Sequence, residues 1–211
     1  MRKPSEILQI LQIFNDRDPN PRCELDYTNA YTLLIAVLLS AQSTDKGVNK
    51  ATKELFKIAD TPQKMLELGI EKLKEYIKTI GLYNNKAKNI IALSEDLIKY
   101  HNGEVPENRE ALEKLAGIGR KTANVILNVW FNQPTIAVDT HVMRISRRLN
   151  LSDGKTPLEI EQDLNNILPD NFKKNANHWL VLFGRYICKA QKPDCLNCPI
   201  TNFCSDKDKK I

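Results

Sequence analysis

The chain has 211 residues, 42% of them hydrophobic and 27% charged, which is enough apolar material for one large domain or two small ones. The longest wholly apolar run, Leu33 to Leu39, is far too short to span a bilayer, and the stretch from Met1 to Glu6 has no signal-peptide apolar region. We therefore expect a folded cytoplasmic protein and exclude a membrane protein. The net charge of +5 permits a polyanionic partner without demanding one.

The first hundred residues are predicted to form a series of helices. Apolar residues at helical spacing predict a helix over 5–14, with Ser5 as its cap. The long apolar run predicts a central buried helix over 30–42, whose polar end puts Gln42 at the rim of the core. Four more helices are predicted over 45–58, 62–68, 70–80 and about 87–100.

Leu82 follows Gly81 in the turn between the last two of these helices. The commoner use of an apolar residue in such a turn is a staple into the core. The alternative is a wedge that enters a DNA base stack.

A helical hairpin is predicted at about 108–131. Its turn contains Gly117 and Gly119, which let the backbone approach a partner closely, and the helix start that follows presents N–H groups suited to a phosphate. The second helix is apolar on nearly every side, so we expect it to be buried deeply. Lys121 in its first turn is a candidate amine nucleophile. On these residues alone, an ordinary turn with a solvated surface lysine is the favoured interpretation.

Beyond a predicted domain boundary near Asn132-Gln133-Pro134, helices are expected over 140–149, 157–168 and 172–188. Asp139 is placed to cap the first of these. That helix carries a basic stripe of Arg144, Arg147 and Arg148, which is either a solvated face or a DNA contact. No segment shows period-two alternation, so the predicted fold class is all-α.

Four of the five cysteines gather near the end of the chain, separated by six, two and five residues: Cys188, Cys195, Cys198 and Cys204. With so few residues between them, their thiolates can converge on one centre. The lack of a secretory signal disfavours disulfides, and structural zinc sites commonly use two Cys-x2-Cys pairs, of which this chain has one. A [4Fe–4S] cluster accepts more varied spacing and is favoured over zinc.

The hairpin sequence Gly117-Ile118-Gly119-Arg120-Lys121-Thr122-Ala123, the segment Val138-Asp139-Thr140-His141 and the cysteine spacing together resemble the endonuclease III family of DNA repair glycosylases. The resemblance covers essentially the whole chain, with Ala116 where the family usually has proline. It implies two helical domains with a cleft between them. Residues 21–133 would form the six-helix domain, and residues 1–20 plus 134–211 the iron–sulfur domain.

The resemblance also implies the chemistry. The enzyme would remove oxidised pyrimidines from double-stranded DNA after flipping the nucleotide, and would then cleave the abasic site. Lys121 would attack C1′, form a Schiff base and permit β-elimination, while Asp139 would stabilise the sugar cation or take a proton from Lys121. The remaining predicted DNA contacts are Gln42 and Leu82 in the opened stack, with Gly117, Gly119, Arg120, His141, Arg144, Arg147 and Arg148.

We further expect a monomer, associated with the nucleoid, whose [4Fe–4S] cluster is structural and held by the four cysteines. The alternatives are a monofunctional glycosylase of the same superfamily, a non-catalytic DNA-binding module and a small electron carrier. Lys121 argues against the first, and Lys121 with Asp139 argues against the second. The third leaves the hairpin unexplained.

Overall fold

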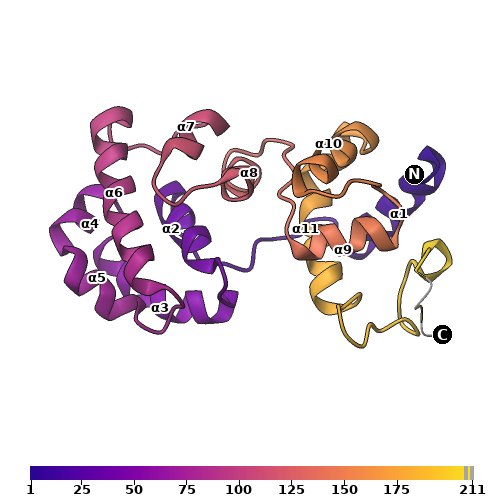
Figure 1. Ribbon diagram of the computed structural model, residues 1–211, viewed down its shortest axis with the longest axis horizontal. Coiled ribbons are helices and arrows are strands. Elements are labelled where there is room, and N and C mark those ends of the chain that lie inside the picture. Colours follow the sequence, from indigo (N-terminus) through magenta and orange to yellow (C-terminus); the bar gives the residue numbers. More distant parts are fainter. Residues whose placement is uncertain (207–208, 210–211) are drawn as a thin grey trace. The chain divides into compact units, whose positions relative to one another are not determined.

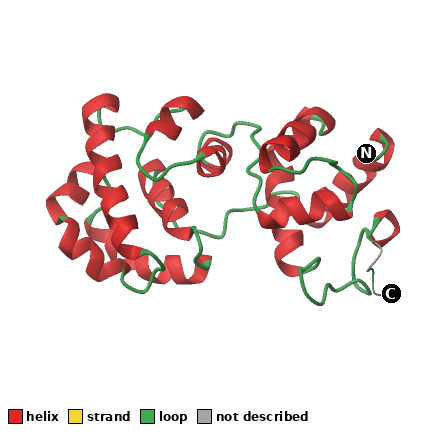
Figure 2. Ribbon diagram, in the orientation of Figure 1, coloured by secondary structure: helices red, strands yellow, loops and turns green. Residues whose placement is uncertain are grey.

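The computed structural model describes residues 1–206 and 209, and these form eleven α-helices and one short 3-10 helix (Figures 1 and 2). No strand occurs among these residues, so the predicted all-α class is confirmed. The chain divides into two compact units, which we call the central unit (Glu24–Asn132) and the terminal unit (Met1–Cys23 with Gln133–Ile211). In the part of the chain that is described, no helix has the length and apolar character needed to cross a membrane.

The central unit is built around α2, in which every residue from Tyr31 to Leu39 is buried. Three helices, α3, α6 and α8, pack against it. Asn29 caps α2 by accepting a hydrogen bond from the Thr32 backbone N–H at 2.8 Å. The helices of this unit are α2 (Ala30–Ser40), α3 (Asp45–Ile58), α4 (Pro62–Leu68), α5 (Ile70–Ile77), α6 (Tyr83–His101), α7 (Arg109–Lys114) and α8 (Arg120–Val129).

Local signals predicted most of these bounds. The ranges of α3 and α4 are as predicted, because Thr44 and Thr61 cap their first turns. Two ends were predicted wrongly around the next turn: α5 ends three residues early, and α6 begins at Tyr83 rather than near 87. The reason is a tight turn in which the Ile80 N–H donates to Ile77 O at 2.8 Å, just before α6 begins.

The prediction that α8 is buried deeply holds for one face of the helix. One face is buried, with Ala123, Ile126 and Leu127 in the core. At its end Trp130 is 38% exposed and packs edge-on against Tyr27, with ring centroids 6.2 Å apart. The helix is therefore amphipathic, with its outer face accessible.

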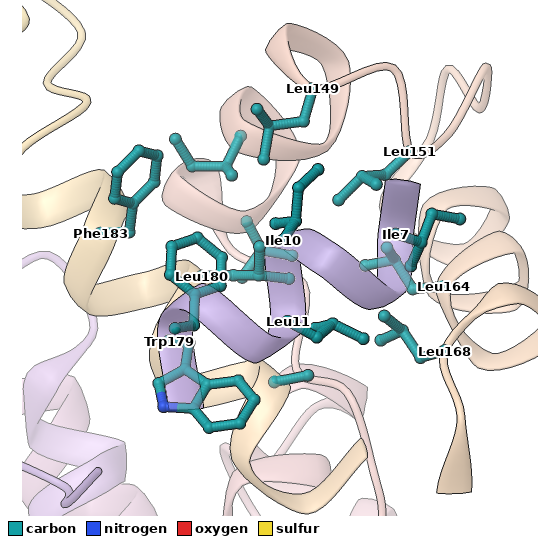
Figure 3. Packing of buried hydrophobic residues seen from close by; sticks show 14 of the residues in the cluster. Ile7, Ile10, Leu11, Leu149, Leu151, Leu164, Leu168, Trp179, Leu180 and Phe183 are labelled. Atoms are coloured by element: carbon teal, nitrogen blue, oxygen red, sulfur yellow. The ribbon is translucent and has the colours of Figure 1, made fainter. Parts of the chain in front are cut away.

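The terminal unit consists of α1 (Pro4–Arg17), α9 (Thr140–Arg148), α10 (Pro157–Ile167), α11 (Asp170–Tyr186) and the 3-10 helix η1 (Thr201–Phe203). Thr156 and Glu159 form the capping box at the start of α10. Ser5 does not cap α1, because the helix begins at Pro4, which is well suited to the first helical position. The apolar faces of the four α-helices form one core (Figure 3); its labelled members include Ile7, Ile10, Leu11, Leu149, Leu164, Trp179, Leu180 and Phe183.

Candidate functional site

The hairpin turn between α7 and α8 contains two glycines. Only one of them occupies a position that requires glycine. Gly117 has a φ of +78°, and a Cβ there would lie 2.6 Å from Nδ2 of Asn89 on α6. Gly119 is the N-cap of α8, with nothing within 4 Å of its Cβ position. Among the described residues, no side chain caps the start of α8. The turn is thus packed against α6 at Gly117, and there is space around the Cβ position of Gly119.

Lys121 lies in the first turn of α8 and its side chain is exposed. The opposite face of the same helix is buried through Ala123 and Ile126. Arg120 precedes it and is half-buried. Lys121 is therefore an accessible amine on a helix whose position the core fixes.

Gln42 and Leu82 lie in two neighbouring turns of the central unit. Both have left-handed backbone conformations, with φ of 56° and 59°. A Cβ on Gly81 would lie 3.8 Å from the carbonyl oxygen of Gln42, so the turns are close together. Leu82 is 61% exposed, which excludes the interpretation of this residue as a staple into the core.

A lysine that the sequence analysis did not single out connects these two turns. The Lys86 ammonium group donates to Leu39 O at 2.9 Å and to Ala41 O at 2.6 Å. The sequence does contain a signal for it. Lys86 occupies the same helical face as Ile90, Leu93 and Leu97, all of which are buried, so a lysine there interrupts an apolar stripe.

In the terminal unit, Asp139 is the N-cap of α9, as predicted. Its Oδ1 accepts hydrogen bonds from the backbone N–H groups of His141 at 2.8 Å and Val142 at 2.9 Å. The segment before it is anchored by the Ala137 N–H, which donates to Asn177 Oδ1 at 2.9 Å. Among the described residues, Oδ2 of Asp139 accepts no hydrogen bond. One oxygen of this carboxylate thus fixes its orientation, and the other is available for chemistry.

The predicted arginine stripe divides into two parts. Arg144 donates to Gly184 O at 2.6 Å and to Cys188 O at 3.1 Å, and its Nη2 lies 3.2 Å from Nδ1 of His141. Arg148 donates to Lys189 O at 2.8 Å and pairs with Asp206 at 2.6 Å. These two arginines hold the segment that carries the cysteines. Arg147 is exposed, with one long contact to Lys155 O at 3.3 Å.

All four clustered cysteines line one pocket of the terminal unit. They are free, half-buried thiols, and Arg148 Nη1 lies 3.3 Å from Sγ of Cys188. Burial raises the pKa of the thiols of Cys188 and Cys198. No group of three or more histidine, cysteine, aspartate or glutamate side chains within 1–206 and 209 has the arrangement of a metal site. The donor set nevertheless fits a thiolate-ligated cluster in type and number.

The predicted site residues divide between the two units. Lys121, Gln42, Leu82 and the hairpin glycines belong to the central unit, and Asp139, the arginine stripe and the cysteines belong to the terminal unit. A family model described as "HhH-GPD superfamily base excision DNA repair protein" matches residues 35–170, which is more than half of the chain. The fold and the hairpin therefore define a base excision DNA repair protein of the helix-hairpin-helix superfamily.

Similar proteins of known activity identify the family within this superfamily. The chain is 56% identical over 202 residues to endonuclease III of Haemophilus influenzae and 53% identical over 202 residues to endonuclease III of Escherichia coli, with 96% of each chain covered in both cases. It is also similar to the solved structure of a trapped endonuclease III–DNA covalent intermediate, with a TM-score of 0.91, 46% identity and 97% coverage of both chains. The chain belongs to the endonuclease III family and is a base excision repair DNA glycosylase and abasic-site lyase.

Proposed function

We propose that this enzyme removes oxidised pyrimidines from double-stranded DNA and cleaves the resulting abasic site through a Schiff base on Lys121. The observation that carries the proposal is the accessible amine of Lys121 on the first turn of the core-anchored helix α8. The similar solved structures contain endonuclease III with DNA, one as a covalent intermediate and one as a non-covalent complex. A nucleophilic amine and a bound duplex are the two requirements of this chemistry.

The proposed reaction proceeds in four steps. The Lys121 amine attacks C1′ of the flipped nucleotide, and the bond from C1′ to the base breaks, with the electron pair leaving on the base. The sugar ring then opens to give an imine between Nζ and C1′. Loss of a proton from C2′ expels the 3′ phosphate, which breaks the strand. Water finally hydrolyses the imine and frees the lysine.

Asp139 is proposed to assist the first step. Its Oδ1 is held by the backbone of α9, whereas Oδ2 accepts no hydrogen bond among the described residues. A carboxylate oriented in this way can stabilise positive charge that develops on the sugar, or accept the proton that Lys121 loses.

We propose that DNA binds to residues of both units. We also propose that these units are the two predicted domains. The uncapped start of α8 and the space around Gly119 suit a phosphate of the backbone. Gln42 and Leu82 are proposed to occupy the stack that the flipped nucleotide vacates, because both are exposed on adjacent turns. On the terminal unit, His141 and the arginine stripe are the proposed phosphate contacts, with Arg147 the most accessible.

We also propose that Cys188, Cys195, Cys198 and Cys204 hold a [4Fe–4S] cluster. Four thiols that line one pocket support a thiolate-ligated site, and their spacing of six, two and five residues favours a [4Fe–4S] cluster over zinc. When bound, the cluster supplies covalent cross-links within residues 188–204. Its proposed role is to keep this segment folded.

The decisive experiment is borohydride trapping on a duplex with an oxidised pyrimidine, in EDTA. Wild type should form a covalent adduct, and Lys121→Ala should form none, because the reduced imine is the only link to DNA. Lys114→Ala, at an exposed lysine on the other hairpin helix, is the matched control and should trap like wild type. Base release without an adduct would instead identify a monofunctional glycosylase, and no base release would identify a DNA-binding module.

A further inference from the structure

Lys86 is a buried lysine that the roles proposed above do not use. It lies near the start of α6 and is 6% exposed. Its ammonium group makes short contacts to two carbonyl oxygens, those of Leu39 and Ala41, and reaches Ser43 Oγ at 3.5 Å. Burying an ammonium group is costly unless it is hydrogen-bonded, so these contacts account for its presence in the core.

The two carbonyl groups belong to the end of α2. The last carbonyls of a helix have no partner within the helix, and a cation at this end is favoured. By binding Leu39 O and Ala41 O, Lys86 secures the point at which α2 stops. The next residue is Gln42, whose left-handed backbone is unfavourable for a non-glycine residue and needs support from its surroundings.

The backbone of Lys86 binds the second turn. Its N–H donates to Leu82 O at 3.1 Å, which makes Leu82 the N-cap of α6. One residue therefore contacts both turns: the main chain binds the turn of Leu82, and the side chain binds the turn of Gln42.

We infer that Lys86 is a positioning residue for the repair reaction, which holds Gln42 and Leu82 at the spacing at which both enter the duplex beside the damaged base. This inference rests on the proposed function, in which these two side chains occupy the vacated stack. Lys86 itself remains buried and acts through the two turns.

The test is a double-mutant cycle between Lys86→Met and Gln42→Ala. Methionine retains the long unbranched side chain and removes the charge. We expect Lys86→Met to lower kcat/KM about tenfold on a duplex with thymine glycol opposite adenine, because the turn of Gln42 loses its support. In the Gln42→Ala background the same substitution should cost less than about threefold, because the side chain that it positions is already absent.

A second substrate separates positioning from general damage to the fold. A duplex with a preformed abasic site has no base to extrude, so Lys86→Met should reduce its cleavage by less than about threefold. Tyr31→Phe is the matched control, since it removes another buried side-chain hydrogen bond between α2 and α6, the 2.7 Å contact of the Tyr31 hydroxyl with Ser94. This variant should process both duplexes like wild type.

The inference is overturned by additive losses in the cycle, or by equal losses on the two duplexes. Failure of the proposed function is distinguishable, because it would appear in wild type as an absence of the borohydride adduct. If Lys86→Met does not fold, Lys86→Gln, which keeps a donor on a shorter side chain, replaces it in the same cycle. The fluorescence of a 2-aminopurine placed opposite the lesion reports directly whether the base stack is opened. Fluorescence as high with the Lys86 variant as with wild type would also overturn the inference.

Discussion

The two units are held together in different ways. In the central unit, apolar packing around α2 accounts for the structure, and the proposed functional side chains Lys121, Gln42 and Leu82 are exposed at its surface. In the terminal unit, an apolar core joins the four α-helices, but the segment after α11 depends on arginines. Arg148 and Arg144 bind it from α9, and Arg2 donates to the carbonyl of Phe203 and, at 3.0 Å, to Ser205 Oγ.

In the central unit, the proposed functional residues are therefore not the residues that stabilise the fold. In the terminal unit, the same residues are proposed to serve both purposes. A functional residue of the central unit can be removed at little cost to folding, since it contributes little burial. A proposed cluster ligand of the terminal unit cannot, because the same residue closes the fold of residues 188–206.

The largest effect is expected from Cys195→Ser. Loss of one thiolate should release the cluster, remove the visible iron–sulfur absorbance and lower the free energy of unfolding of the terminal unit by several kcal/mol, because metal binding contributes to folding. Hydrogen exchange should accelerate in α9 and α11 and stay unchanged in α2.

Cys23→Ser is the control, since Cys23 lies outside the cysteine pocket. It should retain the absorbance and the exchange pattern of wild type. A colourless wild-type protein that contains zinc would contradict the cluster assignment.

Arg148→Met should lower the free energy of unfolding by about 2 kcal/mol, since it removes charge-assisted hydrogen bonds from a half-buried site. The lost partners are Lys189 O and the carboxylate of Asp206. Chemical denaturation can measure the loss.

Arg147→Met on the same helix is the matched control, and its stability should stay within about 0.5 kcal/mol of wild type. Its DNA affinity should instead fall, with a weaker dependence on salt, because Arg147 is the accessible member of the stripe. Equal stability losses in the two variants would remove the distinction drawn between them.

Leu82→Ala should show the opposite pattern in the central unit. Lesion processing should fall about tenfold because the wedge is lost, while the free energy of unfolding changes by less than about 0.5 kcal/mol for so exposed a side chain. Ile58→Ala, at another exposed apolar residue of this unit, is the control and should leave both quantities unchanged. A larger loss of stability than of activity would restore the core-staple interpretation.

The helices and several site residues could be predicted because their signals are local. Caps and apolar periodicity define α3 and α4 within a few residues, and Asp139 caps α9 through neighbours two and three positions away. Periodicity also placed Arg147 on the exposed side of α9, away from the buried Val142 and Ile145.

The partners of these side chains could not be predicted, because they lie far away in the sequence. Lys86 binds carbonyls 47 and 45 residues earlier, and Arg144 binds a carbonyl 44 residues later. Helical spacing determines which way a side chain points, whereas tertiary packing determines what it meets. The exposure of Leu82 was left open for the same reason.

The smallest effect concerns His178 on α11. Burial lowers the pKa of its imidazole below the ordinary value of 6.5; the carboxylate of Asp18 opposes this shift, and Lys174 adds to it. The unfolded chain therefore binds a proton that the folded chain resists, so the stabilisation is complete above pH 6.5 and is lost as the pH falls through the folded pKa. His178→Gln should reduce the slope of unfolding free energy against pH in this window by up to about 1.4 kcal/mol per pH unit.

His101→Gln in the central unit is the control. In wild type, acid should accelerate hydrogen exchange in α11 before it does so in α2, and His178→Gln should remove this difference. Identical slopes for all three proteins would show that this half-buried histidine does not set the acid limit of the terminal unit.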